Sequence, residues 1–421
     1  MKTSFDVAIV GAGPAGASLG VLLARAGWSV ALIERQPFPR RKVCGECIAA
    51  SNLALLDALG VGAAFRARAG AELRRVAWMR GDDAIVAALP AAGGAHRFGR
   101  ALGREHLDTL LADAAAVAGA TRFQPWSLQS IAGDAGRFAL RLRAEKSGDA
   151  GEEVELAAAL VVAAHGSWEP LPGERAERRA ARSRGDLFAF KANFRAAALA
   201  DDLLPVLSFP GGYGGMVVAD DGVLTLAGCV RGDRLQALRA ERPGVRAGDV
   251  FEAMLREQCA GVADALAGAV REGAWIASGP LRPGIRVGAS DGVFRIGNAA
   301  GEAHPIVGEG ISMALQSAFV LASLIAPERA ALVDPASAAV AQARARRVHA
   351  ALWRRRFARR LVVAAVFAHV AMRPRLAACA WPLVQRWPQV LTMGARLSEK
   401  TRVVPEAAGL VPSPAGGRGL G

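Results

Sequence analysis

The sequence predicts an α/β (α+β) fold: a Rossmann-like nucleotide-binding domain, an inserted antiparallel-sheet domain and a C-terminal helical segment. Three observations support this. A strand, a glycine-rich turn, a helix and a second strand follow one another within residues 5–34. Alternating or apolar runs at 187–195, 215–219 and 223–230 indicate a second sheet. Arginines concentrate in residues 341–402, between apolar stretches. A chain of 421 residues accommodates two or three such domains.

The first element is a βαβ unit with a phosphate-binding turn. Gly11, Gly13 and Gly16 fit the pattern G-x-G-x-x-G, and Glu34 closes the second strand. The first glycine permits a tight turn, the second lets the backbone approach a pyrophosphate, and the third lets helix and strand pack closely. The helix N-terminus offers free N–H groups to phosphates, and Glu34 is placed to accept hydrogen bonds from a ribose.

The elements that follow are shorter. A helix is expected at 51–59 with Ser51 as its N-cap, and another at 104–118. Between them and after them the patterns predict strands at 73–80 and 84–89, strand-like segments over 123–164, a charged loop at 171–186, an amphipathic helix at 248–270, and a strand at 293–297 that opens into a loop and a long helix.

Charge and cysteine usage limit the classes of protein. The net charge is +14, but residues 341–402 hold 13 arginines and one lysine against Glu399 alone, so the rest of the chain is nearly neutral. Nothing resembles a nucleic-acid recognition module, so no nucleic-acid partner is expected. Five scattered cysteines do not form a disulfide framework, and the N-terminal stretch lacks the cleavage region of a signal peptide. These features predict a cytoplasmic protein.

Three further motifs follow the glycine turn along the chain. Residues 104–108 read REHLD, residues 164–170 read AHGSWEP, and residues 297–315 read GNAAGEAHPIVGEGISMAL. With the glycine turn, they make residues 1–325 resemble the flavoprotein oxidoreductases of the para-hydroxybenzoate hydroxylase fold. That family includes aromatic monooxygenases, geranylgeranyl reductases and flavin-dependent halogenases. The resemblance implies bound FAD and NAD(P)H as electron donor, and GEGI is most similar to the geranylgeranyl reductase branch.

The last motif also makes chemical sense by itself. Gly308 and Gly310 remove side chains where a helix starting near Ile311 would approach a flat ring. The N-terminus of that helix would stabilise negative charge on reduced flavin. Asn298 stands where the family has Asp, and His165 replaces the Asp of the middle motif, which puts the nicotinamide or hinge role of that motif in doubt.

The residues expected to bind the cofactor come from the glycine turn, the second strand, the cysteine segment, the 104–108 helix and the last motif. They are Gly11, Gly13, Pro14, Ala15, Gly16, Glu34, Arg35, Lys42, Cys44, Arg104, Gly297, Asn298, Pro305, Gly308, Gly310 and Ile311.

With the resemblance, the chain divides into five segments. They are 1–170, the first part of the FAD-binding domain with substrate-sheet strands near 71–95; 171–275, the substrate-binding sheet; 276–330, the second part of the FAD-binding domain; 331–402, basic helices; and 403–421, a Pro/Gly-rich disordered tail.

Cys44 and Cys47 form a C-x-x-C segment that admits three interpretations. In the family this stretch is a strap over the flavin, and K-V-C-G-E-C is similar to it. A redox disulfide would need a second nucleotide-binding βαβ unit, which the sequence lacks. Zinc would need two more ligands, and the remaining cysteines are single, so no metal site is expected. A role in packing only is the third alternative.

The sequence reduces the number of possible reactions but does not select one. The W-x-W-x-I-P motif of halogenases is absent from the sequence, which argues against halogenation. Hydroxylation of an apolar or aromatic small molecule is favoured over C=C reduction in a polyprenyl or lipid substrate, and a non-catalytic flavoprotein or a disulfide oxidoreductase is a further alternative. His304 and Glu46 are the candidate acid–base residues, followed by Glu309. Tyr213 is the single tyrosine of the chain.

The basic segment has two interpretations. Pro374 and Pro382 are expected to break it into short helices that cap the FAD-binding domain. Alternatively, apolar stretches with Trp353, Trp381 and Trp387 between arginine clusters suit peripheral contact with the inner membrane. Its longest uncharged apolar run is about a dozen residues, too short for a bilayer span. The oligomeric state is left open.

Overall fold

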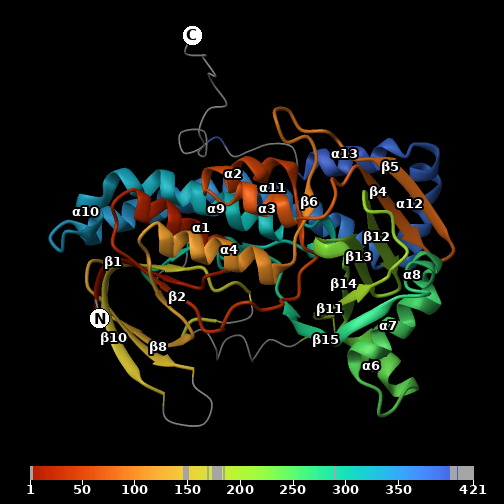
Figure 1. The fold of residues 1–421 in the computed structure, drawn as a ribbon, viewed down its shortest axis with the longest axis horizontal. Helices are drawn as coiled ribbons and strands as arrows, with labels where there is room; N and C mark the ends of the chain where they lie inside the picture. Colours follow the sequence, from red (N-terminus) through yellow and green to blue (C-terminus); the bar gives the residue numbers. More distant parts are fainter. Residues whose placement is uncertain are drawn as a thin grey trace.

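A computed structural model describes residues 3–145, 151–167, 170–172, 183, 185–288, 291–398 and 405. Two large sheets lie at opposite ends of its long axis, and three blue C-terminal helices extend along one side (Figure 1). Helices cover one face of each sheet. The predicted α/β fold class is confirmed.

The first sheet is mainly parallel and has the order β7-β2-β1-β10-β9-β8, with β17 beside β10. Pairs β1/β2, β2/β7, β1/β10 and β10/β17 are parallel, whereas β8, β9 and β10 form an antiparallel meander. The strands are β1 (Ser4–Val10), β2 (Val30–Ile33), β7 (Thr121–Phe123), β8 (Trp126–Ala132), β9 (Phe138–Ala144), β10 (Glu153–Ala163) and β17 (Phe294–Arg295).

Three helices pack against each other on one face of this sheet (Figure 1): α1 (Pro14–Arg25), α4 (Arg104–Val117) and α9 (Gly310–Ile325). Nearly every residue of α9 is buried because it lies between α1 and the C-terminal α11 (Ala338–Ala371). A helix that is apolar on all sides is stable only when it is enclosed in this way. It therefore anchors the loop before it, 297–309, inside the protein.

The second sheet has the order β15-β11-β14-β13-β12-β4-β5 and is antiparallel except for β12/β4. Its strands are β4 (Arg75–Arg80), β5 (Asp83–Ala88), β11 (Leu187–Arg195), β12 (Leu203–Phe209), β13 (Gly212–Val218), β14 (Leu224–Arg231) and β15 (Val270–Leu281). Phe190 stacks on Phe251 of α7 (Ala247–Gln258) at a ring distance of 5.0 Å, so one face packs on helices. Tyr213 and Cys229 are cross-strand partners on the opposite face.

The remaining elements are short connections and surface helices. They are β3 (Cys47–Ile48), β6 (Arg100–Ala101), β16 (Gly284–Ile285), β18 (Gly301–Glu302), α2 (Leu53–Ala58), α3 (Gly62–Arg68), α6 (Gly232–Glu241), α8 (Ala260–Ala265), α10 (Arg329–Val333) and 3₁₀ turns at Ala50–Asn52, Asp220–Gly222, Gly297–Ala299, Pro305–Val307 and Ala326–Glu328.

Several predicted elements need correction. The single helix expected at 248–270 is divided in the structure. Helix α7 ends at Gln258 because Cys259 has the extended backbone angles φ −148° and ψ 103°; the short α8 follows, and Val270 already belongs to β15. Ser51 lies within a 3₁₀ turn and caps no helix; α2 follows it without a side-chain cap. Strands β12 and β15 were not predicted.

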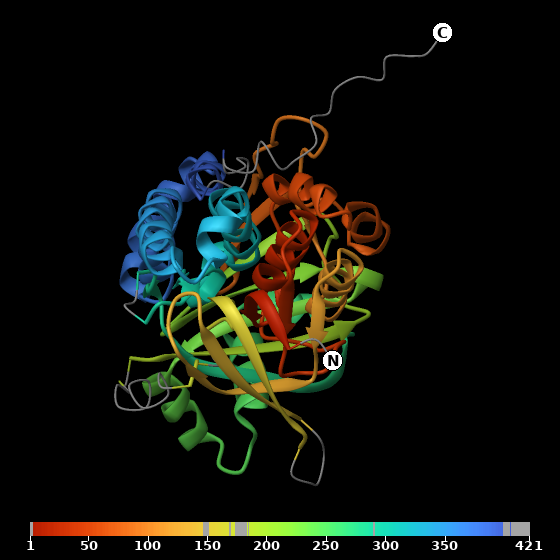
Figure 2. The ribbon, with the colours of Figure 1, turned by 90° about the vertical axis from the view of Figure 1, so that its left-hand side faces the viewer.

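The C-terminal segment also differs from prediction. Helix α11 is one continuous element of 34 residues. Pro374 occupies the first turn of α12 (Pro374–Arg386), where its missing N–H is tolerated, and Pro382 lies inside that helix. Trp387 has the non-helical angles φ −132° and ψ 76° and separates α12 from α13 (Gln389–Leu397). The three helices lie together on one flank (Figure 2). The predicted disordered tail, and most of the charged loop at 171–186, lie outside the described residues.

Two parts of the structure satisfy length and composition criteria for crossing a membrane. One is Gly310–Val333, although 72% of its window is buried inside the protein, as expected of a core helix. The other is the pair α11 and α12, which bends by 104°.

Candidate active site

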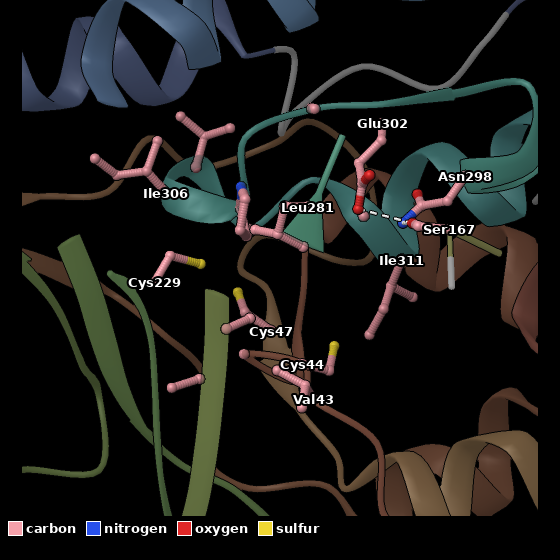
Figure 3. A pocket seen from close by; sticks show the side chains of 18 of the residues that line it. Val43, Cys44, Cys47, Ser167, Cys229, Leu281, Asn298, Glu302, Ile306 and Ile311 are labelled. Carbon is pink, nitrogen blue, oxygen red and sulfur yellow. Dashed lines mark hydrogen bonds between the residues drawn. The ribbon is translucent and has the colours of Figure 1, made fainter. Parts of the chain in front are cut away.

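A cavity of about 880 Å³ lies between the two sheets and reaches the C-terminal helices. Figure 3 shows its middle part, where the side chains of Cys44, Cys47, Cys229 and Ile311 point into one space from different elements. The segments that form the wall are the glycine turn, the cysteine strap (residues 39–49), the cavity face of the second sheet, the 297–311 loop and the helices α11–α13.

The glycine turn closes one end of the cavity. Gly11 has φ +106°, and a Cβ there would lie 2.6 Å from the carbonyl oxygen of Ala164. A Cβ on Gly16 would lie 1.8 Å from the carbonyl oxygen of Gly11. Both positions therefore require glycine for packing, and they bring the start of α1 against the turn. Gly13, the N-cap of α1, lines the cavity with Pro14 and Ala15.

Glu34 fixes the neighbouring strand end. Its Oε2 accepts a hydrogen bond from the N–H of Ala12 at 3.0 Å, and its Oε1 accepts one from Gln36 at 2.9 Å. Arg40 lies 3.4 Å from Oε2. The buried carboxylate faces a part of the cavity that Arg35 and Trp126 also line, and its Oε1 keeps a lone pair for a further donor such as a ribose hydroxyl.

A buried arginine lies beside the turn. Arg104 donates from Nε and Nη2 to the two oxygens of Asp108, at 2.6 and 2.7 Å. A Cβ on Gly13 would lie 3.6 Å from its Nη2. Burial alone would lower the pKa of Arg104, but Asp108 and the Cys44 thiol raise it above its ordinary value. The guanidinium therefore stays charged next to the expected pyrophosphate position.

The 297–311 loop carries a short polar network. Asn298 donates from Nδ2 to Ser167 at 2.9 Å, and Ser167 donates to the buried Glu302 at 2.7 Å (Figure 3). The Glu302 carboxylate also accepts from the N–H of Arg282 at 3.1 Å. This network orients Asn298 at the cavity wall, where the amide would meet the ribityl chain. Ser167 and Glu302 were not predicted as site residues, because they lie 135 residues apart in the sequence and no local pattern indicates their contact.

The start of α9 faces the same cavity. Gly308 has φ +65° in the left-handed region, which reverses the chain after the 3₁₀ turn at Pro305–Val307. Within the described part of the protein, and apart from its chain neighbours and the backbone of its own helix, no heavy atom lies within 4 Å of the position a Cβ would take on Gly310. The first N–H groups of a 16-residue helix therefore border open space beside Ile311.

The strap carries the C-x-x-C segment. Both cysteines carry reduced thiols: Cys44 is half-buried and Cys47 is buried. Between them, Glu46 has φ +56°, and its fully buried carboxylate is paired with Lys191 of β11 and accepts a hydrogen bond from Thr225 of β14. It also accepts from the N–H of Arg104 at 3.1 Å. Glu46, predicted as a candidate acid or base, thus lies where it clamps the strap to the second sheet.

Tyr213 forms a polar contact on the cavity face of the second sheet. Its hydroxyl lies 3.1 Å from Nδ1 of His304. Burial raises the pKa of Tyr213 well above its ordinary value, with a further contribution from Cys229. Burial lowers the pKa of His304, which favours the neutral imidazole. In the tautomer that carries its proton on Nδ1, the imidazole donates to the Tyr213 hydroxyl oxygen and leaves the hydroxyl proton available to a ligand. Burial likewise raises the pKa of Cys229 to about 12.

The far end of the cavity is apolar. Its wall includes Trp78 of β4, Phe367 of α11, Val384 of α12 and Leu391 of α13. The indole rings of Trp78 and Trp381 lie 5.0 Å apart, which fixes α12 on β4. The sequence analysis did not predict that the basic segment contributes to the cavity wall. The tryptophans in that segment were the one feature that could have indicated packing against the rest of the protein.

The predicted cofactor-binding residues thus come together around one cavity, with Gly16 and the acid–base candidate His304 lying just behind its wall. Among the described residues, no group of three or more His, Cys, Asp and Glu side chains is arranged to hold a metal ion.

These residues fit FAD. The open glycine turn with Arg104 would hold the pyrophosphate, Glu34 the adenosine ribose, Asn298 the ribityl chain, and Gly310 with the α9 N-terminus the flavin ring. A mainly parallel sheet with this turn, joined to a second sheet across one cavity, defines the class: a dinucleotide-binding flavoprotein with a separate substrate-binding sheet.

The comparisons with known proteins assign the family. A model described as "FAD binding domain" matches residues 4–218, and the chain belongs to this family. It is therefore an FAD-dependent oxidoreductase by family, which confirms FAD as cofactor and the resemblance inferred from the sequence.

Curated relatives match only short stretches. The menaquinone reductase of Mycolicibacterium smegmatis is 43% identical over 61 residues, 14% of this chain and 15% of the relative. The 6-methylpretetramide 4-monooxygenase of Streptomyces rimosus is 48% identical over 56 residues, 13% of each chain. The aligned parts thus span less than a sixth of these relatives' own length.

Solved structures share the fold over most of the chain. The flavin-dependent brominase Bmp2 superposes with a TM-score of 0.70 at 16% identity, covering 94% of both chains. A geranylgeranyl bacteriochlorophyll reductase-like protein from Thermoplasma acidophilum gives a TM-score of 0.65 at 18% identity, covering 94% of this chain and 100% of the other. At such identity the likeness shows the fold alone, and it includes halogenases as well as a reductase-like protein.

Proposed function

We propose that this protein is an NAD(P)H-driven monooxygenase that hydroxylates an apolar or aromatic small molecule. The observation that carries the proposal is the apolar wall of the cavity, which continues from Ile311 at the expected flavin position to Leu391 in α13. When bound, FAD supplies the transfer of two electrons from NAD(P)H and the activation of oxygen. The overall reaction consumes NAD(P)H, one O₂, one proton and the substrate, and yields NAD(P)⁺, water and the hydroxylated product.

The chain's own residues would bind and orient the reactants and exclude water. The strap and the second sheet enclose the middle of the cavity, which limits water at the reacting centre. The N-terminus of α9 would stabilise negative charge on the reduced cofactor. Tyr213, held by His304, would donate a hydrogen bond to an oxygen of the substrate and so position it.

Reduction of a C=C bond is the second candidate, and the Tyr213–His304 pair favours it. Saturating a double bond adds a hydride to one carbon and a proton to the other. The cavity offers a protonated hydroxyl backed by an imidazole that could replace the lost proton. An elongated apolar cavity would also accept a polyprenyl chain. Sequence similarity to a menaquinone reductase is consistent with this second candidate.

Oxygen dependence separates the two reactions. The FAD-loaded protein is incubated with NADH or NADPH and a panel of phenols, quinones with prenyl chains and polyprenyl diphosphates, with and without oxygen. Hydroxylation predicts one O₂ consumed per product and a gain of one oxygen atom in the product mass. Anaerobic turnover with a gain of two hydrogen atoms would instead establish reduction, and Tyr213→Phe should then slow turnover much more than it weakens substrate binding.

Halogenation is expected to be absent, because W-x-W-x-I-P is missing from the sequence. The same incubations with added chloride or bromide test this, and a halogenated product would overturn it. If no compound accelerates NAD(P)H oxidation and the bound flavin is reduced only slowly by both nicotinamides, the non-catalytic alternative replaces the proposal.

A further inference from the structure

We propose that the exposed face of α11, α12 and α13 docks on an anionic phospholipid bilayer, and that the substrate cavity opens into this face. The attached surface would deliver an apolar substrate directly from the lipid. The substrate part rests on the proposed function, whereas docking itself is measured without turnover, so the two can fail separately.

The exposed side of α11 combines basic and apolar residues in one stripe. Arg355, Arg359, Val362, Val366 and His369 are exposed and are spaced by three or four residues, so they share one helix face. The opposite side is already covered, since Trp353 and Phe357 are fully buried against the FAD-binding part. The inner side of α11 therefore caps the FAD-binding part, and its outer side exposes both basic and apolar residues.

The next two helices extend this face. Both are amphipathic, and both pack their inner sides on β4 and β5. Their exposed arginines and large apolar side chains are Arg375, Leu376, Leu383, Arg386, Trp387, Met393, Arg396 and Leu397. Large apolar side chains that remain outside a folded domain, beside arginines, are typical of surfaces that enter the headgroup region of a bilayer.

The charge of the face favours an anionic partner. From residue 335 to residue 398 the sequence contains no aspartate or glutamate. Across the ranges that the structure describes, no carboxylate lies within salt-bridge distance of Arg375, Arg386 or Arg396. Their positive charge is therefore available to lipid phosphates, and their aliphatic stems can lie along the apolar surface.

The cavity reaches the surface within this same face. Val366 and Leu383 line the cavity and are also 57% and 51% exposed, so they stand at its mouth. Beside them the wall is lined by Phe367, Val370 and Val384, so the entrance from the exposed face is apolar. An aqueous substrate would not need such an entrance, whereas a molecule dissolved in lipid would.

Attachment is expected to be peripheral. Helices α11 and α12 meet at 104°, and arginines occur throughout α11 up to Arg360. An amphipathic surface of this kind lies in the interface and binds by apolar contact together with attraction to anionic headgroups.

Flotation of the full-length FAD-loaded protein with vesicles tests the proposal. Vesicles of phosphatidylcholine alone are compared with vesicles containing about one third phosphatidylglycerol, at low and high salt. We expect binding to the anionic vesicles that falls steeply as salt rises. The variant Arg375→Gln/Arg386→Gln/Arg396→Gln should bind on the order of 100-fold more weakly, since each basic residue contributes about fivefold.

Two further variants make the result specific. Trp387→Ser/Met393→Ser should also weaken binding, because apolar insertion contributes. The matched control Arg141→Gln/Arg143→Gln/Arg239→Gln removes three exposed arginines elsewhere and should bind nearly as the unchanged protein does. Absence of vesicle binding at low salt would overturn the proposal. An equal loss of vesicle binding in the control variant would also overturn it. The same holds if the protein binds double-stranded DNA more tightly than vesicles, in a salt-sensitive way, and the Trp387→Ser/Met393→Ser variant binds that DNA unchanged.

Discussion

Replacing Lys191 with methionine should destabilise the protein severely, because it breaks a buried ion pair. The side chains of Lys191 and Glu46 have no solvent exposure, and they join the second sheet to the strap. In Lys191→Met the carboxylate keeps only neutral donors, Thr225 and the N–H of Arg104. Leaving one charge of a buried pair uncompensated costs about 3–5 kcal/mol. Since total stabilities are about 5–15 kcal/mol, this is a large fraction.

The backbone of Glu46 supports the same reasoning. Its φ of +56° costs a non-glycine residue about 1 kcal/mol, which its buried contacts must offset. Removing both charges in Glu46→Gln/Lys191→Met should therefore recover more than half of the stability that the single lysine change loses. FAD should dissociate faster from the single variant, because the strap is no longer held.

Urea unfolding of the FAD-loaded variants, followed by tryptophan fluorescence, measures these free energies. Arg75→Met is the matched control, because its pair with Asp202 is largely exposed, so water screens it and its loss should change stability little. If Lys191→Met lies within 1 kcal/mol of the unchanged protein, or if the double variant is as unstable as the sum of the single changes, the clamp does not exist as described.

Three other predictions concern the turn, the thiols and a buried histidine. Gly16→Val should abolish FAD binding, because even a Cβ would lie 1.8 Å from a carbonyl oxygen; flavin retained at one per chain would refute this. Cys44→Ser/Cys47→Ser should keep FAD and most NAD(P)H oxidation, and loss of flavin reduction with FAD still bound would restore the disulfide interpretation. Burial lowers the pKa of His349 to about 4, so the unfolded chain binds this proton more readily than the folded one. Stability should fall by up to about 3 kcal/mol as the pH drops from about 6.5 to 4. His349→Gln should remove that part of the pH dependence measured by thermal unfolding, and an unchanged slope would exclude it.

Local patterns made much of the cofactor region predictable. Gly11, Gly16 and Glu34 lie within one βαβ unit, where each residue type is needed for a backbone or hydrogen-bonding reason. Helix α4 and strand β11 were also predicted within a residue of their bounds. In these cases the information that determines the structure lies in neighbouring residues.

Contacts between distant segments were not predictable in this way. Lys191 and Glu46 are separated by 145 residues, and Tyr213 and His304 by 91. Only the folded arrangement of two sheets brings each pair together. Strand β15 was missed because two glycines and a partly exposed pattern obscure its alternation. Helix α11 was predicted too short, since its alanines and arginines favour helix throughout and the first proline comes only after it ends.

The cofactor content of the purified protein tests the central claim most directly. The protein is denatured without proteolysis, and the released flavin is identified by chromatography and quantified against the protein concentration. The structure predicts one FAD per chain, released without covalent attachment, and none from Gly13→Val, whose side chain would enter the pyrophosphate position. FMN in place of FAD, or a folded protein that neither contains nor takes up flavin, would contradict the account.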